Sequence, residues 1–159
     1  MNVVYLFDWG DTLMIDFPQF CGKMCDWKKV QAVDGAKETL ENLSKKSKIY
    51  IATGAAASTQ NDIKKAFARV NLDKYISGYF CKENINIDKG SPEFFSKILK
   101  QLNVEAKNVI VVGDSLQRDI NPALELGINA IWFCNNKSAN KQNLNTIYSL
   151  NELYLQSTK

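Results

Sequence analysis

Two aspartates stand where a predicted strand ends, a position at which a carboxylate can take part in chemistry. Asp8 follows the apolar run 3–7, and Asp114 follows a second run, 109–112. Continuous apolar runs of this length are typical of strands that are buried on both faces of a parallel sheet. Ligands of such sheets bind in the crevice beyond the carboxyl ends of the strands, where both carboxylates would lie. Oxygen ligands from two strand ends predict a site for a hard cation.

The absence of histidine narrows the chemistry further. The chain has 159 residues and no histidine, which excludes Ser-His-Asp and Cys-His mechanisms and zinc sites with histidine ligands. Its four cysteines form no Cys-x-x-Cys pair, so free thiols are expected. Catalysis would then depend on Asp, Glu, Lys, Ser, Thr, Tyr or Cys side chains.

Length and composition indicate one soluble domain over residues 1–159. The chain is 45% hydrophobic and carries a net charge of +3, as ordinary globular domains do. The densest lysine cluster, 45–48, falls at the end of a predicted helix, where cations suit the helix dipole, so there is no strong nucleic-acid signal. No apolar run reaches the roughly eighteen residues of a membrane span, and the chain starts with a strand rather than a signal peptide. A cytoplasmic location is expected.

Predicted strands alternate with predicted helices, which carry start signals such as Asp34 and Ser91. This alternation predicts a three-layer α/β/α, Rossmann-like fold with a mainly parallel five-stranded sheet. Residues 14–32 contain aromatic side chains without a clear period. They predict either a flap, which would form a minimal cap over the strand ends, or a loop whose aromatic residues pack on the core. The strands are expected near residues 3–7, 49–52, 79–81, 109–112 and 130–133.

Polar residues at the strand ends and loops occur in a definite order along the chain: Asp8, Thr53, Lys89, Asp114 and Asp119. In order and spacing, over nearly the whole chain, they resemble the four motifs of the haloacid dehalogenase-like superfamily of hydrolases. The motifs read Phe7-Asp8-Trp9-Gly10-Asp11-Thr12, Ile51-Ala52-Thr53-Gly54, Lys89-Gly90-Ser91-Pro92-Glu93 and Gly113-Asp114-Ser115-Leu116-Gln117-Arg118-Asp119.

The resemblance implies a phosphatase reaction at the first motif. Asp8 would be the nucleophile and would attack phosphorus to form an aspartyl-phosphate, which water then hydrolyses. Thr53 would donate a hydrogen bond to the phosphoryl group. Lys89 would offset negative charge on the nucleophile and on the transferring group.

The resemblance also implies a magnesium site. Mg²⁺ would be held by the carboxylates of Asp8 and Asp114 and by the backbone carbonyl of Gly10. Asp119, with Ser115 nearby in the motif, would support either Lys89 or the water ligands of the metal. A cation is needed because a carboxylate and a phosphate dianion repel each other.

One departure from the family pattern concerns proton transfer. The family's second aspartate, the general acid and base, falls at Gly10, which has no side chain. A positioned proton-transfer group contributes roughly 10²–10⁴-fold to the rate, so modest activity is expected. Asp11 is a hypothetical substitute acid, although a shift of one residue in an extended segment points the side chain the other way.

Two alternatives and one expectation about the substrate complete the sequence-based interpretation. The alternatives are a dehalogenase-type hydrolase that uses the same aspartate nucleophile and a non-catalytic, regulatory protein with the same fold.

About twenty residues separate Leu13 from the helix near Asp34, too few for an inserted helical bundle, so a minimal-cap or capless member is expected. An open site suits a macromolecular phosphate end, or a phosphorylated small molecule whose recognition a neighbouring subunit of a homo-oligomer completes.

Overall fold

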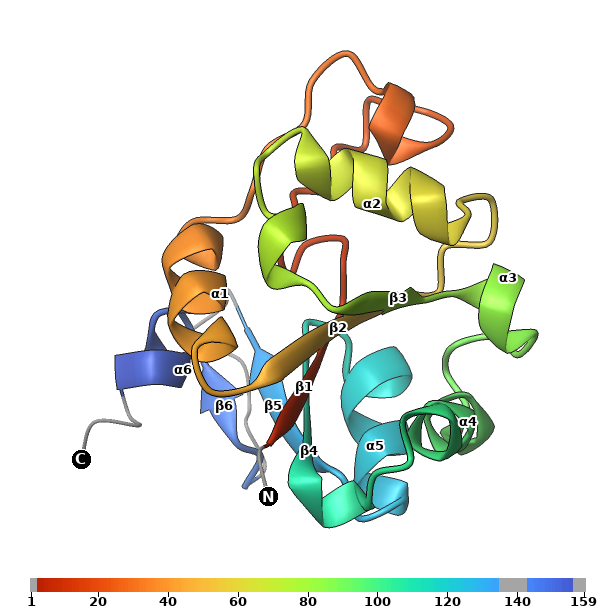
Figure 1. Cartoon of the computed structure of the whole chain (residues 1–159), viewed down its shortest axis with the longest axis vertical. Helices are drawn as coiled ribbons and strands as arrows, with labels where there is room; N and C mark the ends of the chain where they lie inside the picture. Colours follow the sequence, from red (N-terminus) through yellow and green to blue (C-terminus); the bar gives the residue numbers. More distant parts are fainter. Residues whose placement is uncertain (1–2, 135–142, 156–159) are drawn as a thin grey trace.

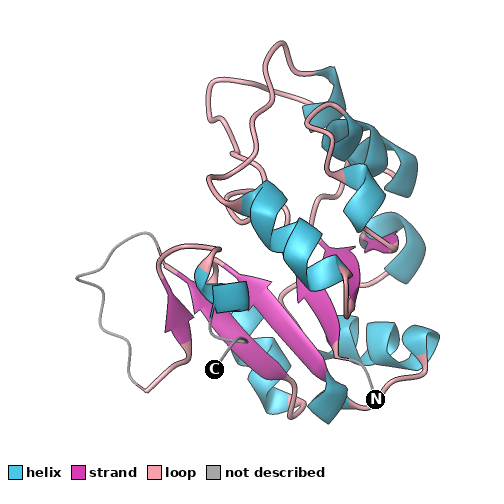
Figure 2. Cartoon of the chain, turned by 60° about the vertical axis from the view of Figure 1, so that its left-hand side comes forward, coloured by secondary structure: helices cyan, strands magenta, loops and turns pink. Residues whose placement is uncertain are grey.

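The protein folds as a parallel sheet that is covered by helices on both faces (Figure 1). The computed structural model describes residues 3–134 and 143–155. The sheet has six strands in the order β3-β2-β1-β4-β5-β6, and every neighbouring pair is parallel. In Figure 2 the strands lie side by side in one layer with helices on either side. These observations confirm the Rossmann-like α/β fold.

The elements follow the alternation that the sequence predicts. The strands are β1 (Val4–Phe7), β2 (Lys48–Ala52), β3 (Gly78–Phe80), β4 (Val109–Gly113), β5 (Asn129–Phe133) and β6 (Thr146–Ile147). The helices are α1 (Ala36–Ser44), α2 (Gln60–Ala68), α3 (Lys82–Ile85), α4 (Pro92–Leu102), α5 (Asn121–Glu125) and α6 (Glu152–Leu155). Among these helices, none is both long and apolar enough to cross a membrane.

The prediction of five strands was wrong, because β6 adds a sixth at the edge of the sheet. Its two residues pair with Trp132 and Phe133 of β5. A strand of two residues shows neither an apolar run nor an alternation, so sequence periodicity could not reveal it. The start of α1 also differs by one residue, since its N-cap is Gly35, at φ 81°, rather than Asp34.

The central strands are buried on both faces. This burial fixes the positions of the residues at their carboxyl ends. Phe7 of β1 belongs to a core cluster that includes side chains of α1 and α2, whereas Leu6 belongs to a second cluster that includes side chains of α4 and α5. Both side chains are fully buried. Alternate residues of β1 therefore lock the strand between two helical layers.

Residues 14–32 form an irregular loop that packs on α2 (Figure 1). Met24 and Trp27 are buried in the same core cluster as Phe7. The guanidinium of Arg69, just after α2, donates hydrogen bonds to the backbone oxygens of Cys25 (3.2 Å) and Trp27 (2.6 Å). This loop therefore packs on the core, and it also contributes Met24 and Trp27 to the wall of the pocket described next.

Candidate active site

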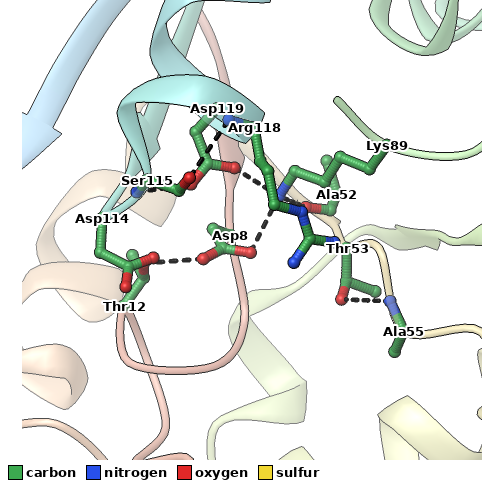
Figure 3. A network of polar contacts seen from close by, with 10 residues as sticks. All are labelled: Asp8, Thr12, Ala52, Thr53, Ala55, Lys89, Asp114, Ser115, Arg118 and Asp119. Carbon is green, nitrogen blue, oxygen red and sulfur yellow. Dashed lines mark hydrogen bonds and ion pairs between the residues drawn. The ribbon is translucent and has the colours of Figure 1, made fainter. Parts of the chain in front are cut away.

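The polar residues of the sequence motifs meet at the carboxyl edge of the three central strands (Figure 3). Asp8 follows β1, Thr53 follows β2 and Asp114 follows β4. Because β1 lies between β2 and β4 and all three are parallel, their carboxyl ends reach the same edge. The side chains line one pocket of about 450 Å³.

Lys89 is the charged centre of this pocket. Its side chain is 2% exposed, and its ammonium group lies 2.8 Å from Oδ1 of Asp8 and 2.5 Å from Oδ1 of Asp119. It also donates a hydrogen bond to the backbone oxygen of Ala52 at 2.7 Å, so two carboxylates and one carbonyl lie around the ammonium group. Burial alone would lower the pKa of Lys89, but the two carboxylates outweigh burial and raise it. Lys89 is therefore a fixed positive charge against Asp8.

Two neighbouring carboxylates have opposite tendencies to ionise. Burial would raise the pKa of Asp8, but the charge of Lys89 and a hydrogen bond with Asp114 bring it below its usual value. Burial, together with the hydrogen bond to Asp8 and its charge, raises the pKa of Asp114 to about 7. The Thr12 hydroxyl stands between them, 3.2 Å from Oδ2 of Asp8 and 3.4 Å from Oδ1 of Asp114. Asp8 is thus held ionised, and Asp114 resists ionisation without further positive charge.

These carboxylates fit a hard cation. One oxygen each of Asp8, Asp114 and Asp119 lies within 4.8 Å of the other two. An all-oxygen donor set is what Mg²⁺ prefers, and burial first, then the neighbouring carboxylates of Asp8 and Asp119, raises the pKa of Asp114, so a cation bound there would favour its ionised form. The Gly10 backbone lines the same pocket.

A short π-helical turn, Leu116–Ile120, positions the last motif. Oδ2 of Asp119 accepts a hydrogen bond from the Ser115 backbone N–H at 3.1 Å, and Oγ of Ser115 accepts one from the Arg118 N–H at 3.1 Å. A Cβ built on Gly113 would lie 2.3 Å from Oδ2 of Asp119. The glycine therefore lets the Asp119 carboxylate approach the end of β4 and reach Lys89.

Arg118 is a pocket residue that the sequence analysis did not single out, although it lies inside the last motif. It lines the pocket, and a Cβ built on Gly54 would lie 1.8 Å from its Nη2 atom. Next to Gly54, the buried Thr53 accepts a hydrogen bond from the Ala55 N–H at 3.1 Å. The combination of an arginine in the fourth motif with a glycine after the second was the signal available in the sequence.

Gly10 and Asp11 lie in the tight loop that follows β1. Asp11 has φ 60° and is exposed, and its Oδ1 accepts a hydrogen bond from the Asp16 N–H at 2.9 Å. All three residues line the pocket. Burial, followed by the charges of Asp11 and Asp8, raises the pKa of Asp16.

Comparison with known proteins gives the family. A family model described as haloacid dehalogenase-like hydrolase matches residues 11–133. The chain is 33% identical over 106 residues to a glyceraldehyde 3-phosphate phosphatase of Pyrococcus furiosus, covering 65% of this chain and 42% of the relative. It is 28% identical over 105 residues to the pyrimidine 5'-nucleotidase PynA of Streptococcus pneumoniae, covering 65% and 43%. The chain thus spans less than half the length of these two relatives.

Solved structures share the fold at lower identity. The HAD-hydrolase YfnB of Bacillus subtilis, solved bound to magnesium, superposes with a TM-score of 0.78 at 17% identity, covering 98% of each chain. A 2-haloacid dehalogenase of Pseudomonas syringae superposes with a TM-score of 0.76 at 19% identity, covering 99% of each chain. The fold alone does not distinguish a phosphatase from a dehalogenase. Because the family model matches more than half of the chain, this protein belongs to the haloacid dehalogenase-like hydrolases.

Proposed function

We propose that this protein is a magnesium-dependent phosphatase that works through an aspartyl-phosphate on Asp8. The observation that carries the proposal is the surroundings of the Asp8 carboxylate. One oxygen is 2.8 Å from the ammonium group of Lys89, and the carboxylate belongs to an oxygen cluster with Asp114 and Asp119. An ionised carboxylate between a fixed cation and a cation site is suited to attack a phosphate ester, which it would otherwise repel.

The position of Asp8 suits it to act as the nucleophile. It follows a strand that is buried on both faces, and the lowered pKa keeps it ionised. Lys89 would offset the charge of the phosphoryl group as it approaches, while Asp119 holds the lysine in place. Thr53 would donate its hydroxyl proton to a phosphoryl oxygen, because that hydroxyl already accepts the Ala55 N–H.

Asp8, Asp114 and the Gly10 carbonyl are the groups that would hold Mg²⁺, with Asp119 and Ser115 supporting them. Bound there, Mg²⁺ would neutralise part of the charge between carboxylate and phosphate and orient the phosphoryl group. The Thr12 hydroxyl, which reaches both Asp8 and Asp114, would keep their oxygens turned toward each other.

The composition of the pocket argues against a dehalogenase. That reaction would require a positively charged pocket for the halide, whereas the described lining here has five carboxylates, including Asp8, and two cations, Lys89 and Arg118. A purely regulatory role is disfavoured by the ion pairs of Lys89, because burying a lysine between two carboxylates is costly to keep without a use.

The substrate we propose is a phosphorylated small molecule. The two relatives described above are named for a sugar phosphate and for nucleotides. Residues 14–32 would serve as the minimal cap, since Met24 and Trp27 give the pocket an apolar side. The guanidinium of Arg118 would contact an anionic group of the substrate.

Hydrolysis of an aryl phosphate, with and without Mg²⁺, tests the proposal. Wild type should turn over only with Mg²⁺, and Asp8→Asn should abolish turnover at equal Mg²⁺. Asp34→Asn is the matched control, because Asp34 is exposed and lies outside the pocket lining. Trapping of a hydroxylamine-sensitive phosphoprotein with wild type but not with Asp8→Asn would identify the intermediate. Metal-independent turnover, or turnover that survives Asp8→Asn, would overturn the proposal.

A further inference from the structure

The loop after β1 holds a carboxylate beside the glycine that replaces the family's general acid. A Cβ built on Gly10 would lie 3.4 Å from Cβ and 3.5 Å from Oδ2 of Asp16. By standard bond lengths an aspartate holds its carboxylate oxygens about 2.4 Å from its own Cβ. At 3.5 Å, an Asp16 oxygen is thus about 1.1 Å farther from that point than the oxygens of an acid at position 10 would be.

We infer that Asp16 is the proton-transfer residue of the reaction, in the role that Gly10 cannot fill. This inference rests on the proposed phosphatase function. Asp16 lines the same pocket as Asp8, in which the ester would bind. Asp16 is also exposed, which lets it exchange protons with solvent between turnovers.

Asp11 is a positioning residue in this arrangement. Its backbone N–H donates to the oxygen of Met14 at 2.7 Å, and its Oδ1 accepts the Asp16 N–H at 2.9 Å. With φ 60° at Asp11, the chain turns back within a few residues and brings Asp16 beside Gly10. Oδ1 of Asp11 is engaged by a backbone donor, whereas Oδ2 of Asp16 lies beside Gly10, 3.5 Å from the position of a Cβ there.

The proton balance of the two steps is complete with Asp16. In the first step an Asp8 oxygen bonds to phosphorus and the ester P–O bond breaks. The leaving oxygen takes the proton of the Asp16 carboxylic acid and departs as an alcohol. In the second step water attacks the phosphorus and gives a proton to the Asp16 carboxylate, while the bond between phosphorus and Asp8 breaks. Asp8 returns as a carboxylate, Asp16 as an acid, and phosphate is released.

The test compares two substrates and follows the kinetics before steady state. With Asp16→Asn, an alkyl phosphate, whose leaving group needs a proton, should be hydrolysed about 10²-fold more slowly or worse. An aryl phosphate should still phosphorylate Asp8, giving a burst of about one phenol per enzyme before slow turnover, because hydrolysis of the intermediate also needs Asp16. Wild type should show steady turnover with no such burst.

Neighbouring variants give the controls. Asp34→Asn, at an exposed residue outside the pocket lining, should keep the wild-type rates. Asp11→Asn keeps the oxygen that accepts the Asp16 N–H, so it should lose less activity than Asp11→Ala. In an Asp16→Ala background, Gly10→Asp should restore alkyl phosphatase activity, because an added Cβ at Gly10 meets only ordinary contacts. Circular dichroism verifies that each variant is folded.

The possible outcomes separate the two proposals. If wild type shows no Asp8-dependent turnover of either substrate, the phosphatase function fails, and this inference fails with it. If wild type is active and Asp16→Asn matches it on the alkyl phosphate without a burst, the inference alone is overturned. A larger loss with Asp11→Asn than with Asp16→Asn would also overturn it and would assign the proton to Asp11.

Discussion

The guanidinium of Arg118 occupies the space that any side chain at Gly54 would need. A Cβ on Gly54 would lie 1.8 Å from Nη2 of Arg118 and 3.2 Å from Cβ of Lys89. The end of β2, the π-helical turn and the loop before α4 therefore meet at one small residue. This contact links the second motif to the fourth without a hydrogen bond between them.

Gly54→Ala should displace the guanidinium of Arg118 from the pocket. We expect KM for an anionic phosphate ester to rise about tenfold, equivalent to ~1.4 kcal/mol of binding. In an Arg118→Ala background the same substitution should have a smaller effect, because only the tight contact with Cβ of Lys89 remains. A double-mutant cycle on KM measures this coupling. Additive effects would mean that Gly54 acts independently of Arg118.

Removing the charge of Lys89 should destabilise the fold as well as stop catalysis. Lys89→Met leaves two carboxylates, Asp8 and Asp119, close together without compensation, and breaking a buried ion pair in this way costs about 3–5 kcal/mol. Urea denaturation at neutral pH measures the loss. Adding Asp119→Asn to Lys89→Met should recover part of it. A double variant no more stable than Lys89→Met would show that packing, not charge, is responsible.

Asp114 should make the metal-free protein less stable as the pH rises. Its pKa is raised from 3.8 to about 7 in the fold, so between these values the folded state holds a proton that the unfolded state has lost. Stability contributed by this proton is fully present below pH 4 and is lost as the pH rises through 7. In EDTA, Asp114→Asn should therefore have a higher Tm than wild type at pH 8, with the difference shrinking toward pH 4.

Magnesium should reverse the order of the Tm values of wild type and Asp114→Asn at pH 8. At 100 times its Kd, the ion stabilises wild type by about 2.7 kcal/mol, whereas Asp114→Asn lacks one ligand and should gain less. Thermal unfolding at pH 8 with and without Mg²⁺ gives the comparison. An equal Tm increase in both proteins would exclude Asp114 as a ligand.

Arg69 should hold residues 14–32 against α2. Arg69→Ala removes two charge-assisted hydrogen bonds, to the oxygens of Cys25 and Trp27. A loss of ~1.4 kcal/mol would raise the open population of the loop about tenfold, with faster cleavage by a protease within this segment. Lys65→Ala, which removes an exposed cation of α2, is the control. Cleavage at the wild-type rate would show that other contacts fix the loop, such as the buried Trp27 and the ion pair between Lys23 and Asp62 of α2.

The sequence was most informative where function depends on the order of strands. Asp8, Thr53 and Asp114 could be grouped from the sequence alone, because parallel strands bring their carboxyl ends to one edge. Lys89 could be assigned to the same site only because the sequence around it resembles a family motif. The six-stranded sheet could not be predicted, since the two residues of β6 are ordered by pairing with β5 and not by their own pattern.

The loop after β1 shows what the sequence could not provide. From the sequence, Asp11 is a hypothetical substitute for the acid that the family pattern would place at Gly10, although a shift of one residue in an extended segment points its side chain the other way. The positive φ of Asp11 and its bond to the Asp16 N–H instead bring a residue six positions after Gly10 next to it. Such proximity depends on one local backbone conformation, which no periodicity encodes. The closeness of Arg118 to Gly54 likewise depends on the fold, although both residue types can be seen in the sequence motifs.

The order of the strands also has a consequence during synthesis. β1 is made well before β4, yet one of its two hydrogen-bonding edges is completed only by β4, with Val4 paired to Val109. At about 5–20 residues per second, a ribosome needs several seconds to add that partner. Through this interval the newly made strand has an edge of unpaired backbone N–H and C=O groups that is open to association with other chains. Asp8 meets Asp114 and Asp119 only when β4 docks, so a nascent chain would be inert until its central sheet is complete.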